Sequence, residues 1–476
     1  GAPTITASAS GLTPASQQLV VRDPPTSLVF LSTPPASIRG GSCLAATVEA
    51  RRGSVPTPVA ADTGISLTAS ADARFFTDST CSTSAVNAVV LNGGAANVTF
   101  FMKPLTGTSL TVSATAPFGS AMQTLNVLPI TRRGTCDFQT RTPLADGGVT
   151  NDLSRTCSFS PPVSDLNASF LVSQTTAALV GTELGSAEVR CRLASTSTVS
   201  CFRRQDESPA SIYFQVSEVP SGMLVQRTSS FSCPATVTLT TPVTPSKSFV
   251  LKSAASSSNT FDDDDTPVVE LVSGTQLALS NTACSGLDVQ VVQWDGVTVA
   301  RSSVDGGLPD AGLSFTVGAP PAGLNRMALV QPGVISTDRP VCGLMLRGST
   351  SSPAAIALTR GAGDAGCPLQ PVEFVLSERI DFGSKASVRE YSATFAPGVA
   401  TRDVSIAPVD VTRTVVLAST QMAGGQGTGE TDTASNARFT ESAFHLVLTN
   451  STTVSARRAE TTSTAAVTFY VLELVP

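Results

Sequence analysis

The chain has 476 residues, more than a single hydrophobic core usually supports, so its length predicts several domains. Only 14% of the residues are charged and the formal net charge is −6, so this acidic chain without a basic stripe is not expected to bind nucleic acid. No apolar run reaches the ~18 residues of a membrane-spanning helix, and we expect no transmembrane segment.

The composition favours strands over helices. Thr and Val are abundant, 36 glycines and 31 prolines interrupt the chain, and no long stretch carries an apolar stripe of helical period. We therefore predict an all-β protein of tandem β-sandwich domains, one Ig-like and about four related to one another, with almost no helix. A surface rich in hydroxyl groups and poor in charge suits an extracellular location on a bacterial cell surface.

The ten cysteines indicate the same compartment. Their number is even and none lies in a CxxC or CxxH spacing, so we predict disulfides in an oxidising environment and no zinc site. Cys136, Cys157, Cys191 and Cys201 share one predicted module, and the sequence leaves their three possible pairings open. Pairing neighbours gives Cys43–Cys81, Cys136–Cys157, Cys191–Cys201, Cys233–Cys284 and Cys342–Cys367.

Residues 1–22 predict a pair of strands without a domain of its own. The segment alternates on both sides of a turn at Gly11, as residues 110–125 do around Pro117 and Gly119. Two strands alone cannot bury a core. The pair is therefore either the tail of a truncated upstream Ig-like domain or a donor that completes the sandwich of another subunit.

Residues 24–130 show short alternating segments at regular spacing, separated by turns rich in Pro, Gly, Asn and Asp, which is typical of an Ig-like sandwich. The predicted strands are Ser27–Leu31, Cys43–Ala50, Gly64–Ser70, Ala85–Leu91, Asn97–Met102, Leu110–Ala114 and Met122–Val127. Through Leu28–Phe30, Gly41–Cys43, Ala73–Phe76, Val98–Phe100 and Leu110–Ala114 the stretch resembles bacterial Ig-like domains of large surface proteins, especially those of myxobacteria. This resemblance implies a fold and a spacer role, and no chemistry.

A segment that alternates apolar and polar residues then recurs at 212–218, 288–294, 372–378 and 467–473, and we call this recurrent segment the phrase. Each copy predicts the last strand of a module, with Ile212, Phe214 and Val216 on one face of the first copy. A second landmark, usually a Pro-Val pair before a β-branched strand, lies inside each module. It occurs at 162–173, 242–251 and 408–417, with a weaker match at 332–342.

The landmarks divide the remaining chain into four predicted sandwich repeats, 131–220, 221–296, 297–381 and 382–476. The repeats either stand singly or dock in pairs as two larger domains, 131–296 and 297–476. Their last strand is similar to the strand that ends the β-sandwich of H-type lectins, and this resemblance implies sugar binding and trimers. Arrays of repeats usually hold, reach or bind, so we predict that the chain is not an enzyme and uses no cofactor.

The candidate polar residues each have a structural interpretation. His445, the single histidine, alternates with Phe444 and Leu446 in a predicted strand, which indicates a surface or module-interface imidazole. The carboxylates Glu218, Glu378 and Glu473 recur at the end of the phrase, which indicates a structural role such as edge-strand charges.

Two loops and four aromatic residues complete the candidates. The run Asp262, Asp263, Asp264 and Asp265 predicts a solvated loop, with a calcium site as the alternative. The Gly-rich segment 424–429 predicts a flexible loop, because no strand–helix context surrounds it. The candidates for a sugar-binding platform are Trp294, Tyr213, Tyr391 and Tyr470, and Trp294 equally suits a wedge between modules.

We expect an extracellular structural protein, a subunit of a bacterial surface filament or appendage or an adhesin, which self-associates as a homopolymer or homo-oligomer. The alternative is a lectin-like tip that binds a glycan or a receptor without catalysis, with loops 257–266 and 423–432 carrying specificity. A hydrolase would need a polar pocket that holds a perturbed carboxylate.

Overall fold

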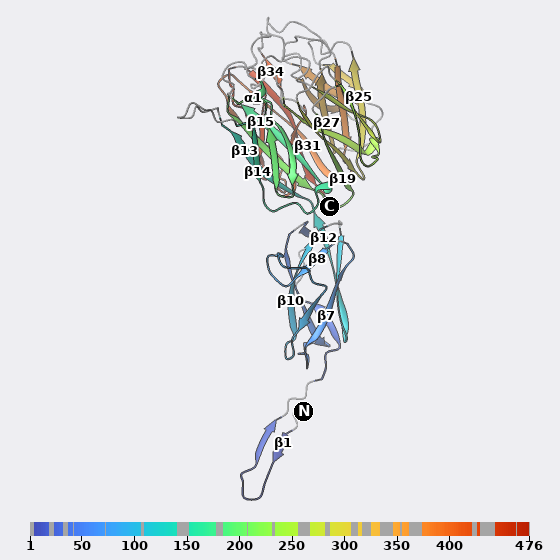
Figure 1. The fold of residues 1–476 in the computed structure, drawn as a ribbon, viewed down its shortest axis with the longest axis vertical. Helices are drawn as coiled ribbons and strands as arrows, with labels where there is room; N and C mark the ends of the chain where they lie inside the picture. Colours follow the sequence, from blue (N-terminus) through green and yellow to red (C-terminus); the bar gives the residue numbers. More distant parts are fainter. Residues whose placement is uncertain are drawn as a thin grey trace. The chain divides into compact units, whose positions relative to one another are not determined.

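The computed structural model divides the chain into two compact units, Gly1–Leu128 and Pro129–Pro476 (Figure 1). We call them the first and the second unit and describe each by itself. The structure describes residues 4–18, 23–31, 37–40, 42–71, 73–105, 109–139, 152–177, 184–206, 208–230, 234–255, 267–280, 286–305, 313–316, 325–333, 346–352, 355–360, 374–420, 426–428, 443–462 and 464–475.

The first unit begins with a hairpin of β1 (Thr4–Ala7) and β2 (Ala15–Gln18), in which Thr4 pairs with Gln18. All four residues of β1 are exposed, and Ile5 and Leu12 expose 58% and 72% of their surface. The hairpin therefore carries apolar side chains that no core covers.

The rest of the first unit is a sandwich of two antiparallel-rich sheets, ordered β3-β5-β10-β8 and β4-β12-β11-β7-β9, with β6 paired to β5. In β11, Leu110, Val112 and Ala114 alternate inward, which is the period of a strand with one buried face. The strands are β3 (Ser27–Phe30), β4 (Ser37–Arg39), β5 (Leu44–Arg52), β6 (Val55–Pro56), β7 (Thr63–Ala69), β8 (Ala73–Phe76), β9 (Ala88–Leu91), β10 (Asn97–Pro104), β11 (Ser109–Ala116) and β12 (Gly119–Leu128). Each of the seven strands predicted for this stretch overlaps one of them.

The second unit repeats one arrangement of six strands four times. We name the strand positions A to F in chain order, and the modules 1 (130–218), 2 (223–294), 3 (298–381) and 4 (386–474). In every module strands A, F and C form one antiparallel sheet and strands B, E and D form the other. The fold-class prediction of tandem β-sandwiches is confirmed.

The strands of modules 1 and 2 are β13 (Ile130–Phe138), β14 (Ser154–Ser158), β15 (Ser169–Ala177), β16 (Arg190–Ser195), β17 (Thr198–Phe202) and β18 (Ala210–Glu218), then β19 (Met223–Ser230), β20 (Ala235–Thr238), β21 (Ser248–Ala254), β22 (Val268–Ser273), β23 (Gln276–Ser280) and β24 (Leu287–Trp294). Helix in the described chain is limited to α1 (Leu184–Ala187) and two 3₁₀ turns, η1 (Leu166–Ala168) and η2 (Pro245–Lys247).

The strands of modules 3 and 4 are β25 (Thr298–Asp305), β26 (Leu313–Thr316), β27 (Arg326–Gly333), β28 (Leu346–Ser352), β29 (Ala355–Arg360) and β30 (Phe374–Asp381), then β31 (Ala386–Phe395), β32 (Thr401–Ser405), β33 (Thr414–Ala418), β35 (His445–Asn450), β36 (Thr453–Arg457) and β37 (Thr464–Leu474). An additional strand, β34 (Gln426–Thr428), pairs with β37 inside the Gly-rich segment that was predicted as a loop.

The recurrent phrase is strand F, the central strand of its sheet, with A on one side and C on the other. Its central place explains the alternation, because both faces of the strand are buried and each faces a different core. The weaker landmark of module 3 was wrongly placed. Pro332 and Gly333 lie at the end of strand C itself, β27, and not in the turn that precedes it.

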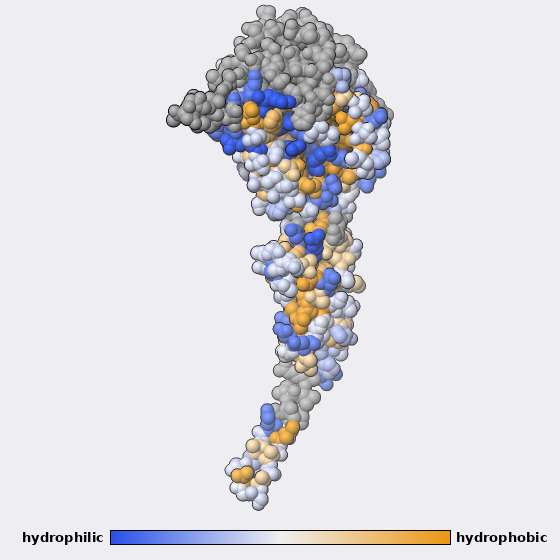
Figure 2. Space-filling model, in the orientation of Figure 1, coloured by the Kyte–Doolittle hydropathy of each residue, from blue (hydrophilic) through white to orange (hydrophobic). Residues whose placement is uncertain are grey.

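Apolar side chains form two kinds of core in the second unit. Modules 1, 2 and 4 each have a cluster between their own two sheets. A further cluster joins residues of all four modules, among them Phe170, Trp294, Phe382 and Leu472. On the face shown in Figure 2, hydrophobic residues appear as separate groups among hydrophilic ones. Within the described part of the chain no helix is long and apolar enough to cross a membrane.

Candidate functional site

A polar side chain from strand F of each module bonds the backbone of strand C of the preceding module. Gln290 of module 2 donates to the carbonyl of Leu171 at 2.7 Å and accepts from its N–H at 2.9 Å. Glu378 of module 3 occupies the same register and accepts from the N–H of Val250 at 2.8 Å. An amide suits this place because it satisfies the N–H and the C=O of one residue together.

A second set of contacts runs from strand C to strand D of the preceding module. Gln331 of module 3 bonds both the N–H and the C=O of Val269, at 2.9 and 3.1 Å. The hydroxyl of Ser253 accepts from the N–H of Cys191 at 2.9 Å, and that of Ser419 accepts from Gly348 at 3.1 Å. These side chains anchor each C strand on the first residues of the neighbouring D strand.

Both sets of contacts also join module 1 to module 4, so the four modules form a closed ring. Gln215 of module 1 bonds the N–H and the C=O of Val416, at 3.0 and 2.7 Å, across 201 positions of the chain. Gln174 accepts from the N–H of Leu446 at 2.8 Å. Strand β13 of module 1 lies against β33 of module 4, and β15 and β18 lie against β35, within the second unit of Figure 1.

His445 lies in this closing junction and not on the surface. Its Nε2 is 2.7 Å from the carbonyl of Ser211, to which it donates, and 3.3 Å from the hydroxyl of Thr176. The side chain is buried beside the ring of Tyr213, and burial lowers the pKa of His445 from 6.5 to about 4. The neutral imidazole, with its proton on Nε2, therefore joins two modules.

Two of the carboxylates at the end of the recurrent phrase, Glu218 and Glu473, bind the segment that follows the Pro-Val pair of their own module. Glu218 accepts from the N–H of Ser164 at 2.7 Å and from Arg132 at 2.8 Å, and both side chains of the ion pair are buried. Glu473 accepts from the N–H of Asp410 in the same way at 3.3 Å. The Pro-Val landmark and the end of the phrase therefore recur together because one binds the other.

The suggestion that these carboxylates are edge-strand charges is wrong. Glu218, Glu378 and Glu473 lie on β18, β30 and β37, which are central strands. The strand pairing also shows that Glu378 is not equivalent to Glu218, because it occupies the position of Gln215 and Gln290. Its carboxylate forms an ion pair with Arg301 at 2.8 Å. Burial raises the pKa of Glu378, while the charge of Arg301 opposes that rise.

The four aromatic candidates do not form an exposed platform. Trp294, Tyr213 and Tyr470 are buried, and Trp294 packs edge-on against Phe382 at a centroid distance of 5.9 Å between modules. Tyr391 is half-buried, stacks on Phe469 at 5.8 Å and accepts a hydrogen bond from Ala407. Their placement assigns all four to packing, and Trp294 lies at a module junction.

The structure forms the disulfides Cys43–Cys81, Cys136–Cys157 and Cys191–Cys201, which are neighbour pairs. Outside the described residues lie Cys233, Cys284, Cys342, Cys367 and Asp262 to Asp265, together with loop 257–266 and most of loop 423–432. No group of three or more His, Cys, Asp or Glu side chains suited to a metal ion occurs in the part that is described.

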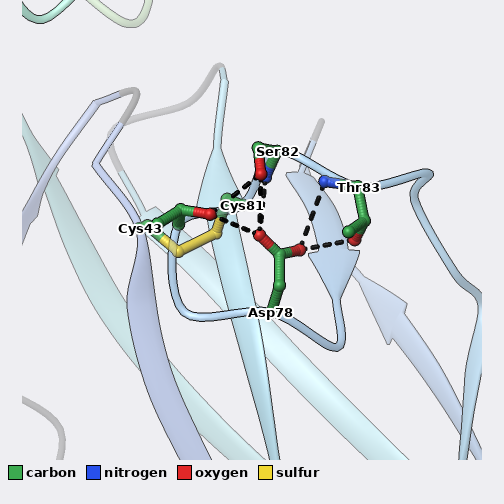
Figure 3. Close-up of a disulfide and its surroundings, with 6 residues drawn as sticks. Cys43, Asp78, Cys81, Ser82 and Thr83 are labelled. Carbon is green, nitrogen blue, oxygen red and sulfur yellow. Dashed lines mark hydrogen bonds between the residues drawn. A yellow bond between two sulfur atoms is a disulfide. The ribbon is translucent and has the colours of Figure 1, made fainter.

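A polar turn surrounds the first disulfide (Figure 3). The Asp78 carboxylate accepts from the N–H groups of Ser82 and Thr83, at 2.9 and 3.2 Å, and from three hydroxyls, including that of Thr80 at 2.6 Å. These bonds, led by that of the Ser82 amide, hold the pKa of Asp78 far below its usual value. They fold the turn that carries Cys81 and engage both oxygens of the Asp78 carboxylate.

Connection length differs between the two ends of the ring. Strands D and E are separated by two residues in every module, namely 196–197, 274–275, 353–354 and 451–452. The C–D connections leave the opposite end of the strands and are much longer: 178–189, 255–267, 334–345 and 419–444. Since each C strand ends beside the start of a neighbouring D strand, these connections depart from one end of the ring.

Sequence reasoning did not find Gln174, Gln215, Gln290 and Gln331, which join neighbouring modules of the ring. Gln215 and Gln290 each lie in the middle of a phrase copy, and no partner was predicted for either. Aligning the copies on these glutamines, instead of on the final acidic residue, would have given the correct register.

No family model matches the chain, and no curated protein matches it. Among solved structures the chain is similar to α2-macroglobulin of Escherichia coli, with 10% identity and a TM-score of 0.16, over 94% of this chain and 50% of that one. It is similar to domains 4–9 of the surface layer protein SbsC, with 11% identity and a TM-score of 0.19, over 97% and 86%. The C-terminal domain of Streptococcus pyogenes AspA matches at 9% identity and a TM-score of 0.11, over 40% and 88%.

TM-scores this low support no conclusion about fold or function, and the chain spans half the length of the macroglobulin. The resemblances to myxobacterial Ig-like domains and to H-type lectins stay predictions.

Proposed function

We propose that the chain is an extracellular, non-catalytic adhesive protein of a bacterial surface, and that its second unit is the binding head. The observation that carries this proposal is the asymmetry of the ring, with two-residue turns at one end and long connections at the other. Binding residues are commonly found on loops that a firm scaffold presents together. The two loops expected to carry specificity, 257–266 and 423–432, both belong to C–D connections.

The scaffold suits a mechanical role outside the cell. Three disulfides tie strands together in the described chain, and disulfides persist in oxidising compartments. Cross-module bonds from Gln215, Gln290 and Gln331 join the modules without any reactive group. The lone imidazole, His445, is buried in the ring, which supports a non-catalytic role.

The test is adhesion of purified protein to bacterial and host cell surfaces. We expect binding by the intact chain, and its loss when residues 256–266 are replaced by a Gly-Ser linker. The matched control is Ser451→Gly in a two-residue turn at the other end of the ring, which should bind normally. Equal adhesion of both variants, with unchanged unfolding midpoints, would contradict a binding face at the C–D connections.

A filament subunit is the second candidate, and the exposed hairpin favours it. Ile5 and Leu12 offer apolar surface on a two-stranded sheet that another copy could cover. Electron microscopy and sedimentation over a concentration series separate the candidates. Fibres that disappear in Ile5→Ser would support the filament, and monomers at all concentrations would exclude it.

A further inference from the structure

The junction between modules 1 and 2 contains an open polar pocket of about 320 Å³. Strand D of module 1 forms one wall with Arg192, and strands A and F of module 2 form the other. The second wall carries Arg227, Thr228, Ser229, Asp288 and Gln290. The pocket thus holds two guanidinium groups, two hydroxyls and one carboxylate, and no aromatic ring.

Arg227 is a half-buried cation that forms no ion pair in the described part of the chain. Its Nη2 donates to the carbonyl of Ser169, and its Nε is buried with no hydrogen-bond partner. Burial lowers the pKa of Arg227 to about 10, and the charge of Asp165 offsets only part of this effect. Withdrawing part of a guanidinium from water without a counter-charge costs free energy, and an anion beside Arg227 would offset part of that cost.

Arg192 lies exposed at the pocket and forms no ion pair in the described structure. It belongs to a basic group, because the charges of Arg192 and Arg204 both act on Arg190. Asp288 is the one carboxylate among the residues that line the pocket. It lies 3.7 Å from Arg190 and accepts from the hydroxyl of Ser229. This part of an acidic chain is therefore locally positive and attracts anions.

The other junctions do not place two arginines at these positions. In module 1 the place of Arg227 is held by Arg133, which donates to the carbonyls of Val411 and Thr414. The place of Arg227 is held in module 3 by Arg301, which pairs with Glu378 at 2.8 Å. In module 4 it is held by Glu390, which accepts from the backbone N–H of Thr350 at 2.7 Å and from the hydroxyl of Ser349, the residue at the place of Arg192. Only between modules 1 and 2, among the described junctions, do two arginines hold these two places.

We propose that this pocket binds one acidic monosaccharide unit, a uronic or sialic acid, with its carboxylate between Arg192 and Arg227. Guanidinium groups bind carboxylates through charge-assisted hydrogen bonds. Asp288 accepts from the sugar hydroxyls, and Thr228 and Ser229 supply further hydrogen bonds at the same wall. The pocket volume lies at the small end of ligand sites, which suits one sugar ring. The choice of a glycan rests on the proposed adhesive function, while the anionic character rests on the arginines alone.

The test measures binding of glucuronic acid, N-acetylneuraminic acid and neutral glucose to the full chain, by calorimetry and ligand-observed NMR. We expect at least one acid to bind about tenfold more tightly than glucose, because a charge-assisted bond is lost with the neutral sugar. Arg192→Ser, which installs the residue of the module 3 position, should weaken that binding about tenfold. Raising the salt concentration should weaken it as well.

The matched control is Arg402→Ser, which removes an exposed arginine of module 4 and should leave binding unchanged. Arg227→Gln is a second variant, and the fluorescence of Trp294 reports whether each variant is folded. Equal binding of acids and glucose would overturn the proposal, as would unchanged binding in folded Arg192→Ser. Acetate or inorganic sulfate that competes as tightly as the sugar acids would overturn the saccharide assignment.

Failure of the site and failure of the adhesive function give different results. If acidic sugars do not bind but the chain still adheres to cells, the pocket assignment is wrong and the adhesive function stands. If acidic sugars bind through Arg192 while the chain adheres to no cell, the pocket stands and the adhesive function is wrong.

Discussion

The two units differ in how their hydrophobic cores are built: the first unit has one core of its own, and the modules of the second unit share one. In the first unit the buried apolar residues form one cluster between its own two sheets, from Leu28 to Val127. In the second unit the largest cluster passes through all four modules and includes Phe249, Trp294 and Phe382. A domain below about 100 residues buries too little surface to be very stable, so shared burial compensates. The first unit should therefore unfold alone, and the four modules together.

The polar contacts also differ between the two units: they lie within one domain in the first unit and between modules in the second. The first unit is held by strand pairing, as in the ladder of β11 and β12. Between modules of the second unit, side-chain amides take the place of a neighbouring strand and bond single backbone groups. Such bonds set the position of each module against the next without merging their sheets, so every module keeps two short sheets and the ring still closes.

The sharpest way to break this comparison is to open the shared core. Phe382 is 1% exposed and packs edge-on against both Trp294 and Phe249, at 5.9 and 6.2 Å between ring centroids. Phe382→Ala should destabilise the whole second unit by about 3–5 kcal/mol. Trp294 is the only tryptophan of the chain, so its fluorescence during denaturation reports this unit alone.

The matched substitution in the first unit is Phe100→Ala. Phe100 is fully buried and packs against Phe30 and Phe75. Calorimetry should show that it lowers the melting of the first unit and leaves the Trp294 transition in place. A loss of only one module in Phe382→Ala, with the other three still melting together, would contradict the shared core.

The sequence predicted the strands but not the side of the strand that matters for assembly. Ile212, Phe214 and Val216 were assigned to one face, and they form the core of module 1. Tyr213 and Gln215 lie on the opposite face, and the sequence did not predict what covers it. Both residues are buried, and Gln215 bonds the backbone of Val416 in module 4. Period-two patterns show two faces and do not say what covers the polar one.

The closing junction adds a pH dependence that the first unit lacks. Burial lowers the pKa of His445 to about 4, below its usual 6.5, so the unfolded chain takes up a proton that the folded ring excludes. The contribution is complete above pH 6.5 and is lost as the pH falls towards 4. We expect a loss of up to about 3 kcal/mol over this window.

Denaturation series followed by Trp294 fluorescence at several pH values measure this loss. His445→Gln keeps a donor for the carbonyl of Ser211 and removes the titration, so its stability should be nearly flat over the same window relative to the natural chain. A pH slope that is identical in both proteins would show that other groups cause it.

Ring closure can be tested by removing one amide at a time. Gln215→Ala leaves the buried N–H of Val416 without its acceptor, and Gln290→Ala leaves the N–H and the C=O of Leu171 without their partner. Each should cost about 1–3 kcal/mol in denaturation followed by Trp294 fluorescence. Gln290 joins module 2 to module 1, which precedes it in the chain, whereas Gln215 joins module 1 to module 4 and so closes the ring. If the chain were an open row of modules, Gln215→Ala would have no effect.

The register of the phrase shows where the sequence was insufficient. The copies were aligned on Glu218 and Glu378, because both end an alternating run. The pairing of strands shows instead that Gln215, Gln290 and Glu378 are equivalent. In module 2 the equivalent of Glu218 is therefore Gln293, and Trp294 lies one residue further along the strand. Which residues of two repeats are equivalent depends on how each strand pairs with its neighbours. An alternating sequence fits equally well when it is shifted by a few residues, so the sequence alone does not fix this register.

The smallest effect is expected at Asp78, where the first unit relies on a local turn. Its carboxylate accepts from the amides of Ser82 and Thr83, next to Cys81, which has a positive φ of 51°. Asp78→Ala removes those acceptors at an exposed site, so the melting temperature of the first unit should change far less than in Phe100→Ala. Hydrogen exchange should speed up at the Ser82 and Thr83 amides only. Because the pKa of Asp78 is strongly lowered, this protection should persist throughout the acid range in which His445 titrates. Faster exchange throughout β11 and β12 would show that the turn supports the whole sandwich.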